Sequence, residues 1–235
     1  MSAAAMISSV GVVIPVANEQ ATIGACLHSL EVARARLHSA VSPDLEVRIV
    51  VVLDRCIDGT AAIVRRHRRV ESVACSAGRV GAARAVGTDR LLGDVRGSLR
   101  QVWLANTDAD STVPPDWLTA QVAEACRGAH LVLGTVLPEA GLAAVTESAW
   151  FDGHRLREGH PHVHGANLGI RADVYTALGG WSGLSTGEDV ALAARAASAG
   201  QLQIVRTARI PVRTSSRLTG RAPRGFAGYL RELPA

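Results

Sequence analysis

The sequence has 235 residues, 48% hydrophobic and 20% charged, a composition typical of one globular domain with a substantial buried core. The formal net charge is +4, every basic residue other than histidine is arginine, and aromatic residues make up only 3%. This argues against a stacking platform for nucleic acid but leaves recognition of phosphate by arginine open.

Targeting and membrane signals are weak in this sequence. The longest unbroken apolar run, Ile49 to Leu53, is far shorter than the ~20 residues that a membrane span needs, and the N-terminus lacks a charged region followed by a long apolar one. We therefore expect a cytoplasmic protein. The cysteines form no C-x-x-C pair, so we expect reduced, structural thiols rather than a zinc knuckle or disulfide framework.

Apolar runs alternate with helical patterns in the first part of the chain. Val10–Val16 and Leu45–Leu53 are near-continuous Val/Ile/Leu stretches, which predict strands buried on both faces of a parallel sheet. Apolar residues recur near helical spacing from Ile23 to Leu37, which predicts a βαβ unit. The alternation continues with expected helices at 59–68, 79–92 and 116–127, and expected strands at 71–75, 101–107 and 131–137.

The second part is less regular. Residues 141–161 lose periodicity and predict a loop-rich insertion. After it we expect a strand at 163–170, helices at 172–178 and 188–198, and a strand at 201–205. Residues 213–235 are too polar and too rich in Gly and Pro to predict a packed helix. Their arginines suit either a mobile loop that closes over phosphates or a solvated tail that touches anionic lipid head groups.

Polar side chains follow the expected strands where each strand ends. They are Asn18 and Glu19, Asp54, Asp108 and Asp110, and the stretch from His164 to Asn167. Ligands of open parallel sheets bind outside the carboxyl ends of the strands, so these groups can converge on one cleft. Taken singly, Asn18 and Asp58 are equally well explained as helix caps.

Asp108 and Asp110 form a D-x-D pair, in which like charges raise each other's pKa unless a cation intervenes. Such a pair suits Mg²⁺ or Mn²⁺ held jointly with substrate phosphates, or else it is an Asp-rich turn before Pro114. His160, His162 and His164 share one face if the segment is extended, as metal or acceptor contacts or as a solvated loop. No companion Cys or H-E-x-x-H motif supports a zinc site.

Six segments taken in order carry a resemblance. They read VVIPVANEQATIGACLHSL, VVVLDRCIDGTAAIV, GAARAVG, LANTDADSTVPPDWL, HGANLGIRADVYTALGGW and GEDVALAARAASAG. Together, from Val10 to about Gly200, they resemble the family 2 glycosyltransferases, enzymes of GT-A fold that use nucleotide sugars. The resemblance implies one α/β domain over 1–235, with a mixed, mostly parallel sheet flanked by helices. It divides into a nucleotide-binding half (1–110), an acceptor and catalytic half (111–212) and an Arg-rich tail loop (213–235).

The resemblance also implies roles for individual residues. The first nucleotide-contacting loop would include Pro15, Ala17, Asn18 and Glu19; Asp54 would bind the base or ribose, and Arg84 would lie by the nucleotide. Asp108 and Asp110 would hold the metal and the diphosphate, with Asp110 as the preferred direct ligand. Asp189 would be the catalytic base and Glu188 would help to hold the acceptor. Further candidate acceptor or metal contacts are His164, Asn167, Trp181 and Arg217.

Two positions depart from the family pattern, with Leu53 where an Asp is usual and Ala85 where an Asn is common, and both can alter the choice of nucleotide. The implied reaction is a Mn²⁺- or Mg²⁺-dependent, inverting transfer from a UDP- or GDP-sugar to a small or carrier-linked acceptor. Two other hypotheses remain: a catalytically silent nucleotide-binding module, which the two departures favour, and a nucleotidyltransferase. The latter usually carries a Gly-rich basic loop after its first strand, and PVANEQAT has none.

Overall fold

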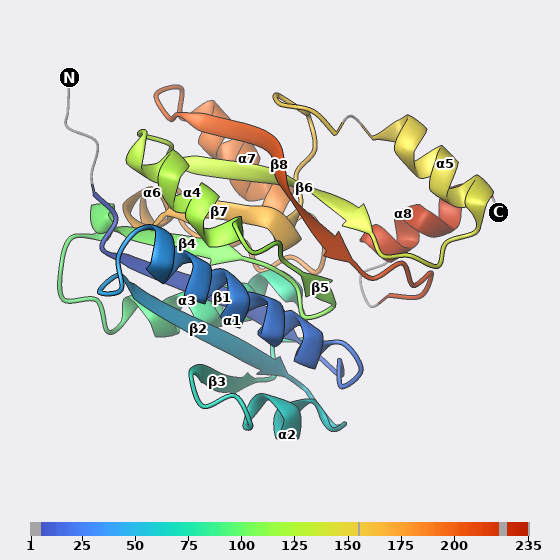
Figure 1. The fold of residues 1–235 in the computed structure, drawn as a ribbon, viewed down its shortest axis with the longest axis horizontal. Coiled ribbons are helices and arrows are strands. Elements are labelled where there is room, and N and C mark those ends of the chain that lie inside the picture. The colour runs from blue at the N-terminus through green and yellow to red at the C-terminus, as the bar shows by residue number, and fades with distance from the viewer. Residues whose placement is uncertain (1–5, 155, 221–224, 235) are drawn as a thin grey trace.

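The computed structural model describes residues 6–154, 156–220 and 225–234, and within them the chain forms a three-layer α/β fold around one eight-stranded sheet (Figure 1). The strand order is β3-β2-β1-β4-β7-β6-β8-β5. The strands are β1 (Ser9–Val16), β2 (Glu46–Asp54), β3 (Val70–Cys75), β4 (Val102–Asn106), β5 (Ser111–Thr112), β6 (Leu131–Pro138), β7 (Leu168–Arg171) and β8 (Ile204–Thr214). The α-helices are α1 (Ile23–Ala40), α2 (Thr60–Val64), α3 (Val80–Leu92), α4 (Trp117–Cys126), α5 (Ala144–Gly153), α6 (Ala172–Ala177), α7 (Glu188–Ser198) and α8 (Phe226–Glu232).

The sheet is mixed but mostly parallel, as expected. Strands β3, β2, β1 and β4 run parallel to one another, and β6 runs parallel to β8. Strand β7 is antiparallel to both of its neighbours, and β5 is antiparallel to β8. The carboxyl ends of β1 and β4 are therefore adjacent, and the loops that follow them meet at one edge of the sheet.

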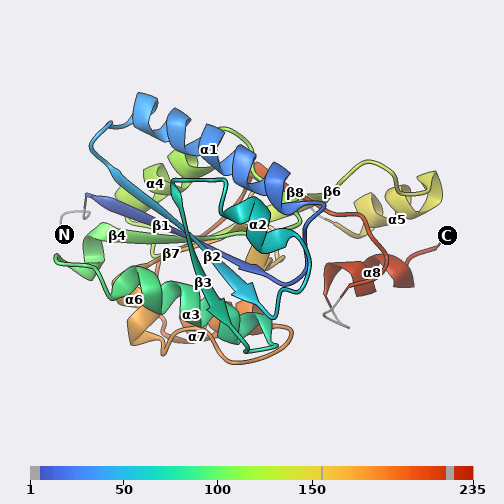
Figure 2. The same ribbon diagram turned by 90° about the horizontal axis from the view of Figure 1, so that it is seen from below.

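Helices cover both faces of the sheet, which explains the apolar runs of its central strands. Helices α1 and α4 pack on one face and α3, α6 and α7 on the other (Figure 2). Each face has its own hydrophobic cluster, and in β1 Val12 and Ile14 enter one cluster while Val13 between them enters the other. Gly87 of α3 lies so close to the sheet that a Cβ atom there would be 2.7 Å from γ-carbons of Val13 and Val52.

Two helices contradict the sequence expectations. Helix α5 lies in the segment expected to be loop, and α8 lies in the tail for which a packed helix was not expected. They pack against each other, beyond the end of the sheet where β6 and β8 point (Figures 1 and 2). The Trp150 ring lies 6.4 Å from that of Phe226, and the Thr146 hydroxyl donates to the carbonyl of Pro234 at 2.8 Å. Each helix thus buries an apolar face that neither could bury alone.

Other boundaries shift by smaller amounts. Strand β8 extends to Thr214, well beyond the expected 201–205, whereas β7 begins only at Leu168 because residues 165–167 form a 3₁₀ turn. Helix α2 is shorter than expected. In the part of the chain that the structure describes, no helix is both long and apolar enough to cross a membrane.

Candidate functional site

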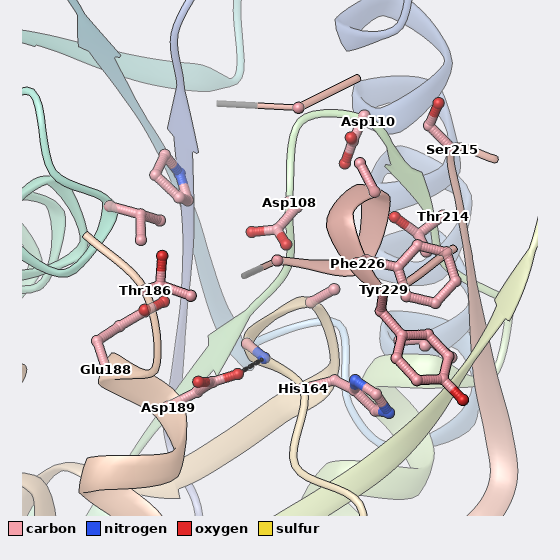
Figure 3. Close-up of a pocket in the computed structure, with 18 of the residues that line it drawn as sticks. Asp108, Asp110, His164, Thr186, Glu188, Asp189, Thr214, Ser215, Phe226 and Tyr229 are labelled. Atoms are coloured by element: carbon pink, nitrogen blue, oxygen red, sulfur yellow. Dashed lines mark hydrogen bonds between the residues drawn. The ribbon is translucent and has the colours of Figure 1, made fainter. Parts of the chain in front are cut away.

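A cavity of about 450 Å³ opens where the carboxyl ends of β1 and β4 meet the ends of β6 and β8 (Figure 3). Its walls come from the loops after β1 and β4, from α3, from the first turn of α7, and from the chain between β8 and α8. The expected convergence of polar groups on one cleft is therefore confirmed for a defined subset. The candidate residues that line the cavity are Pro15, Glu19, Arg84, Asp108, Asp110, His164, Glu188, Asp189 and Arg217.

A buried arginine connects the two halves of this site. Arg84 is 1% exposed and donates to Asp108 Oδ1 at 2.5 Å and to Glu188 Oε1 at 3.2 Å. Its guanidinium lies 5.4 Å from the ring centre of Trp181, and its Nη1 has no hydrogen-bond partner among the described residues. Gly165 makes room for it, because a Cβ there would be 2.6 Å from an Arg84 nitrogen. Arg84 therefore fixes one acid on the β4 loop and one on α7.

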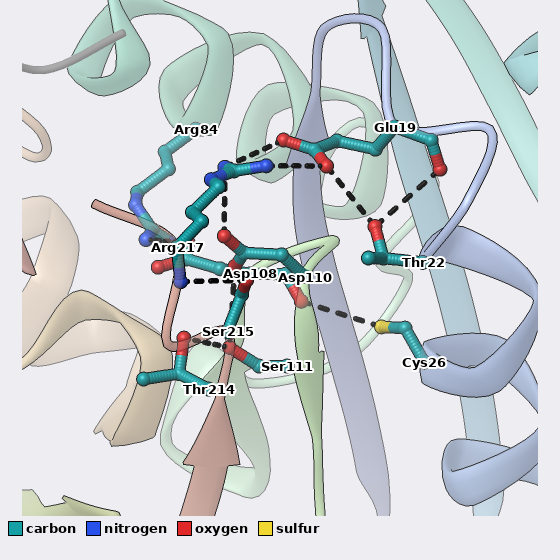
Figure 4. Close-up of polar contacts among 10 residues, drawn as sticks. All are labelled: Glu19, Thr22, Cys26, Arg84, Asp108, Asp110, Ser111, Thr214, Ser215 and Arg217. Atoms are coloured by element: carbon teal, nitrogen blue, oxygen red, sulfur yellow. Dashed lines mark hydrogen bonds and ion pairs between the residues drawn. The ribbon is translucent and has the colours of Figure 1, made fainter. Parts of the chain in front are cut away.

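A second arginine binds the remaining acids (Figure 4). Arg217 makes a bidentate pair with the buried carboxylate of Glu19, at 2.7 and 2.8 Å, and its Nη2 lies 2.7 Å from Asp110 Oδ2. Burial, first, and the neighbouring Asp108 raise the pKa of Asp110 to about 6, although Arg217 opposes the rise. Each acid of the D-x-D pair thus has one arginine partner, Arg84 for Asp108 and Arg217 for Asp110.

Strand pairing brings Arg217 to the acids. The two residues of β5, which follow Asp110 directly, pair with Arg213 and Thr214 at the end of β8. The Ser111 hydroxyl donates to Thr214 Oγ1 at 2.9 Å, and the amide of Ser215 donates to the carbonyl of Asp110 at 3.0 Å. The chain that leaves β8 is therefore held directly over the D-x-D loop.

The two acids of Gly-Glu-Asp lie in the first turn of α7 and point to different partners. Asp189 accepts from the amide of Gly165 at 2.6 Å through Oδ2 and from the amide of Val190 at 2.8 Å through Oδ1. Glu188 is buried against Arg84, and burial raises its pKa. Asp189 therefore presents the less enclosed carboxylate to the cavity, while Glu188 anchors the arginine.

Four residues with ring side chains also line the cavity: His154, His164, Phe226 and Tyr229. On the right of Figure 3, His164 and Tyr229 face the cavity across from Glu188 and Asp189. Sequence reasoning identified only His164 among them. Helical periodicity gave no sign of the others, because α5 and α8 are short and bury few side chains each.

Several candidate residues do not line this cavity, and for Asn167 the structure corrects the expected contact. Asn167 is fully buried and binds Trp117, Thr135 and Ile210 through its side chain, so it is structural. Trp181 packs beneath Arg84 and does not line the cavity. Ala17, Asn18 and Asp54 are also absent from its lining.

The loops that carry Asn18 and Asp54 explain their orientation. Asn18 has a left-handed φ of 53° and accepts from the amide of Ile57 at 2.8 Å, so it ties two loops together instead of capping α1. Both carboxylate oxygens of Asp54 accept from the amide of Gly78, at 3.0 and 2.8 Å. Asp58 accepts from the amide of Thr60 at the start of α2, close to the capping role that the sequence suggested.

The chemistry of the donor set bears on a metal ion. Among residues 6–154, 156–220 and 225–234, no group of three or more His, Cys, Asp or Glu side chains is arranged to hold one. The rings of His160, His162 and His164 stand in a row, 5.8 and 6.0 Å apart, instead of converging. Asp108 and Asp110 fit a hard divalent ion that takes its other ligands from a substrate or water, because such ions prefer carboxylate oxygens.

A buried thiol next to the acids had no signal in the sequence. Cys26 of α1 donates to the carbonyl of Asp108 at 3.3 Å. Burial and the two nearby carboxylates raise its pKa well above the usual range. Cys26 therefore stays a neutral thiol that supports the D-x-D loop.

Comparisons with solved structures show the same fold. S. aureus TarS residues 1–349 in complex with UDP is 15% identical, with a TM-score of 0.62 over 89% of this chain and 61% of that one. The mannosyltransferase PcManGT from Pyrobaculum calidifontis, in complex with GDP-Man and Mn²⁺, is 19% identical, with a TM-score of 0.63 over 94% and 59%. Glucosyl-3-phosphoglycerate synthase from M. tuberculosis, in complex with Mn²⁺ and UDP-glucose, is 17% identical, with a TM-score of 0.53 over 88% and 70%. The chain spans about three fifths of the length of the first two.

Among the curated proteins no sequence matches. The family model described as "Glycosyl transferase family 2" matches residues 11–175, well over half of the chain, and this range includes the D-x-D loop and strand β7. The sheet order, the flanking helices and the solved structures agree with the GT-A fold that the sequence suggested. The chain belongs to the family 2 glycosyltransferases.

Proposed function

We propose that this protein transfers a sugar from a nucleoside diphosphate sugar to an acceptor hydroxyl, with inversion at the anomeric carbon and with the help of Mn²⁺ or Mg²⁺. The observation that carries the proposal is that Asp189 and the pair Asp108 and Asp110 line one cavity and are connected through Arg84 and Glu188. The UDP, GDP-Man and UDP-glucose complexes of similar structures support a donor of this class.

Asp189 is our candidate for the general base. Each of its oxygens accepts one amide hydrogen bond, which fixes the carboxylate and leaves lone pairs free to accept the proton of an acceptor hydroxyl. General base catalysis typically contributes 10²–10⁴-fold to the rate. Glu188 is better suited to hold Arg84 than to take a proton, since its Oε1 accepts from that guanidinium.

Asp108 and Asp110 would hold the divalent ion, which, when bound, neutralises the negative charge of the departing nucleoside diphosphate. Arg84, which lines the cavity, keeps Asp108 in place. Glu19 and Arg217 close the same side of the cavity. One side of the cavity would thus bind the ion and the diphosphate, and the other side would carry the base, Asp189.

A matched pair of variants tests this proposal. We expect Asp189→Asn to lower the release of nucleotide from UDP-glucose or GDP-mannose with Mn²⁺ by 10²–10⁴-fold, because the amide cannot accept the proton. Stabilisation by nucleotide and Mn²⁺ should persist, and a ligand at 100 times its Kd raises the free energy of unfolding by about 2.7 kcal/mol. Asp110→Asn should instead lose the Mn²⁺-dependent part of that stabilisation.

Undiminished turnover in Asp189→Asn would contradict the assignment of the base. A panel of UDP, GDP, ADP and dTDP, each with and without Mn²⁺, identifies the nucleotide by thermal shift. Stabilisation by one nucleotide with Mn²⁺, but no turnover of any sugar that it carries, would favour the silent binding module. The transferase ranks first because Asp108, Asp110 and Asp189 line the same cavity.

A further inference from the structure

The end of the cavity built by α5 and α8 differs chemically from the end that holds the D-x-D pair. His154 enters it from the end of α5, His164 precedes the 3₁₀ turn, and Phe226 and Tyr229 come from α8. Helix α8 lies beyond residues 11–175, which match the family description. The four side chains are defined here as the ring wall.

A stack of rings holds this wall in place. The ring of the fully buried Trp150 stacks on that of His154, with ring centres 4.1 Å apart and an interplanar angle of 13°. The ring of His162 also stacks on that of His154, with ring centres 4.8 Å apart. Tyr229 meets His154 edge to face, with ring centres 5.2 Å apart. Rings fixed in this way lose little conformational entropy when a ligand binds.

The two histidines of the ring wall favour their neutral form. Burial lowers the pKa of His154, and burial together with the neighbouring histidines lowers the pKa of His164 to about 3. Among the described residues that line the cavity, the guanidinium groups are those of Arg84 and Arg217, and both are paired with carboxylates at the other end. The ring wall therefore offers ring faces and neutral nitrogen and oxygen atoms.

We propose that the ring wall is an acceptor subsite and that it binds the ring of a neutral saccharide. The inference rests on the proposed function. The C–H face of a sugar ring is apolar and packs on Phe226 and Tyr229, while its hydroxyls bond to the imidazole of His164 and the phenol of Tyr229. The size of the cavity, about 450 Å³, lies within the range of small-molecule sites.

The position of the ring wall brings such an acceptor to the base. His164 directly precedes Gly165, whose amide donates to Asp189 Oδ2 at 2.6 Å, and both His164 and Asp189 line the cavity, so an acceptor on the ring wall shares one space with the base. The acceptor oxygen forms a bond to the anomeric carbon and its proton passes to Asp189. The bond from that carbon to the diphosphate oxygen breaks, and its electron pair leaves with the nucleoside diphosphate.

The test measures how each variant divides the donor between water and an added acceptor. Methyl hexopyranosides serve as the neutral probe and phosphoglyceric acid as the anionic one, with UDP-glucose or GDP-mannose and Mn²⁺. We expect the neutral sugars to be glycosylated, and Tyr229→Ala and Phe226→Ala to lower the ratio of transfer to hydrolysis by about tenfold, equivalent to losing one aromatic contact. Tyr229→Phe, which keeps the ring but loses the phenol, should lower that ratio less than Tyr229→Ala does.

Phe151→Ala is the matched control, because Phe151 lies on α5 next to Trp150 but is 46% exposed and does not line the cavity. Its ratio should equal that of the unmodified protein. Use of phosphoglyceric acid in place of the sugars, or equal ratios in Tyr229→Ala and Phe151→Ala, would overturn the subsite while leaving the proposed function intact. Absence of both donor hydrolysis and stabilisation by any nucleotide would overturn both proposals.

Discussion

At the scale of single residues, Arg217 pairs with Asp110, the acid that we propose as a ligand of the metal ion. Its guanidinium lies between Glu19 and Asp110, within 2.8 Å of a carboxylate oxygen of each, and is about a third exposed. If Asp110 holds the ion as proposed, this tethered cation would compete with Mn²⁺ for the same carboxylate. The ion and Arg217 would then be alternative partners of that acid.

We expect Arg217→Ala to tighten the binding of Mn²⁺ in the absence of nucleotide, by roughly three- to tenfold, because about 1 kcal/mol of competition is removed from a partly exposed pair. Thermal shift against Mn²⁺ concentration measures it. Arg213→Ala is the control, since Arg213 is exposed on β8 and lines no part of the cavity. Unchanged or weaker binding of Mn²⁺ in Arg217→Ala would show that the two cations do not compete.

The imidazole of His164 makes the free energy of unfolding depend on pH. Burial lowers the pKa of His164 from 6.5 to about 3 in the folded chain. Between these values the unfolded chain binds the proton and the folded chain does not, so the free energy of unfolding falls as pH falls below about 6.5. We expect urea unfolding between pH 7 and pH 5 to show a smaller loss in His164→Gln. Equal losses in both proteins would place the acid sensitivity elsewhere.

At the scale of elements, periodicity was sufficient for the central sheet and insufficient for its periphery. Strand β1 is buried on both faces, so its composition alone predicts it. Strand β8 continues to Thr214 with exposed Arg209 and Arg213 alternating with buried residues, whereas the sequence predicts a strand only over 201–205 and a tail from 213. Helices α5 and α8 depend on each other for burial, and the contact between residues 150 and 226 cannot be read from local sequence.

The packing of α3 on the sheet gives a prediction at this scale. Gly87→Ala places a Cβ 2.7 Å from stiff γ-carbons of Val13 and Val52, and such overpacking typically costs 1–3 kcal/mol. Better helix propensity offsets at most about 1 kcal/mol of it. We expect a net fall in the free energy of unfolding by urea denaturation. Gly97→Ala, with no atom within 4 Å of its new Cβ, is the control, and equal stability of the two variants would contradict tight packing at Gly87.

At the scale of the whole molecule, topology explains which part of the site could be anticipated. Acids after β1 and β4 had to meet, because parallel neighbours end at the same edge. Arg217 and Glu19 are 198 residues apart in sequence, and their pairing depends on β5 and β8 closing the far edge of the sheet. The ring wall depends on α8 returning to α5. Both features come from long-range contacts that no local pattern encodes.

The distribution of charge gives a final prediction. The chain has a formal net charge of +4, yet the described residues that line the cavity include five carboxylates and only two guanidinium groups. A nucleoside diphosphate is repelled by that excess, and a divalent ion removes the repulsion, so nucleotide and Mn²⁺ should bind with positive coupling.

By linkage, each ligand raises the affinity of the other by the same factor, and couplings of this kind are typically 5–150-fold. Calorimetric titration of UDP or GDP, whichever nucleotide binds, in saturating Mn²⁺ and in EDTA measures the factor directly. Asp110→Asn should reduce the coupling towards one, because the variant lacks the carboxylate that we assign to the ion, whereas Asp189→Asn should preserve it. Equal nucleotide affinity with and without Mn²⁺ in the unmodified protein would mean that Arg84 and Arg217 alone hold the diphosphate, and the role assigned to Asp108 and Asp110 would be wrong.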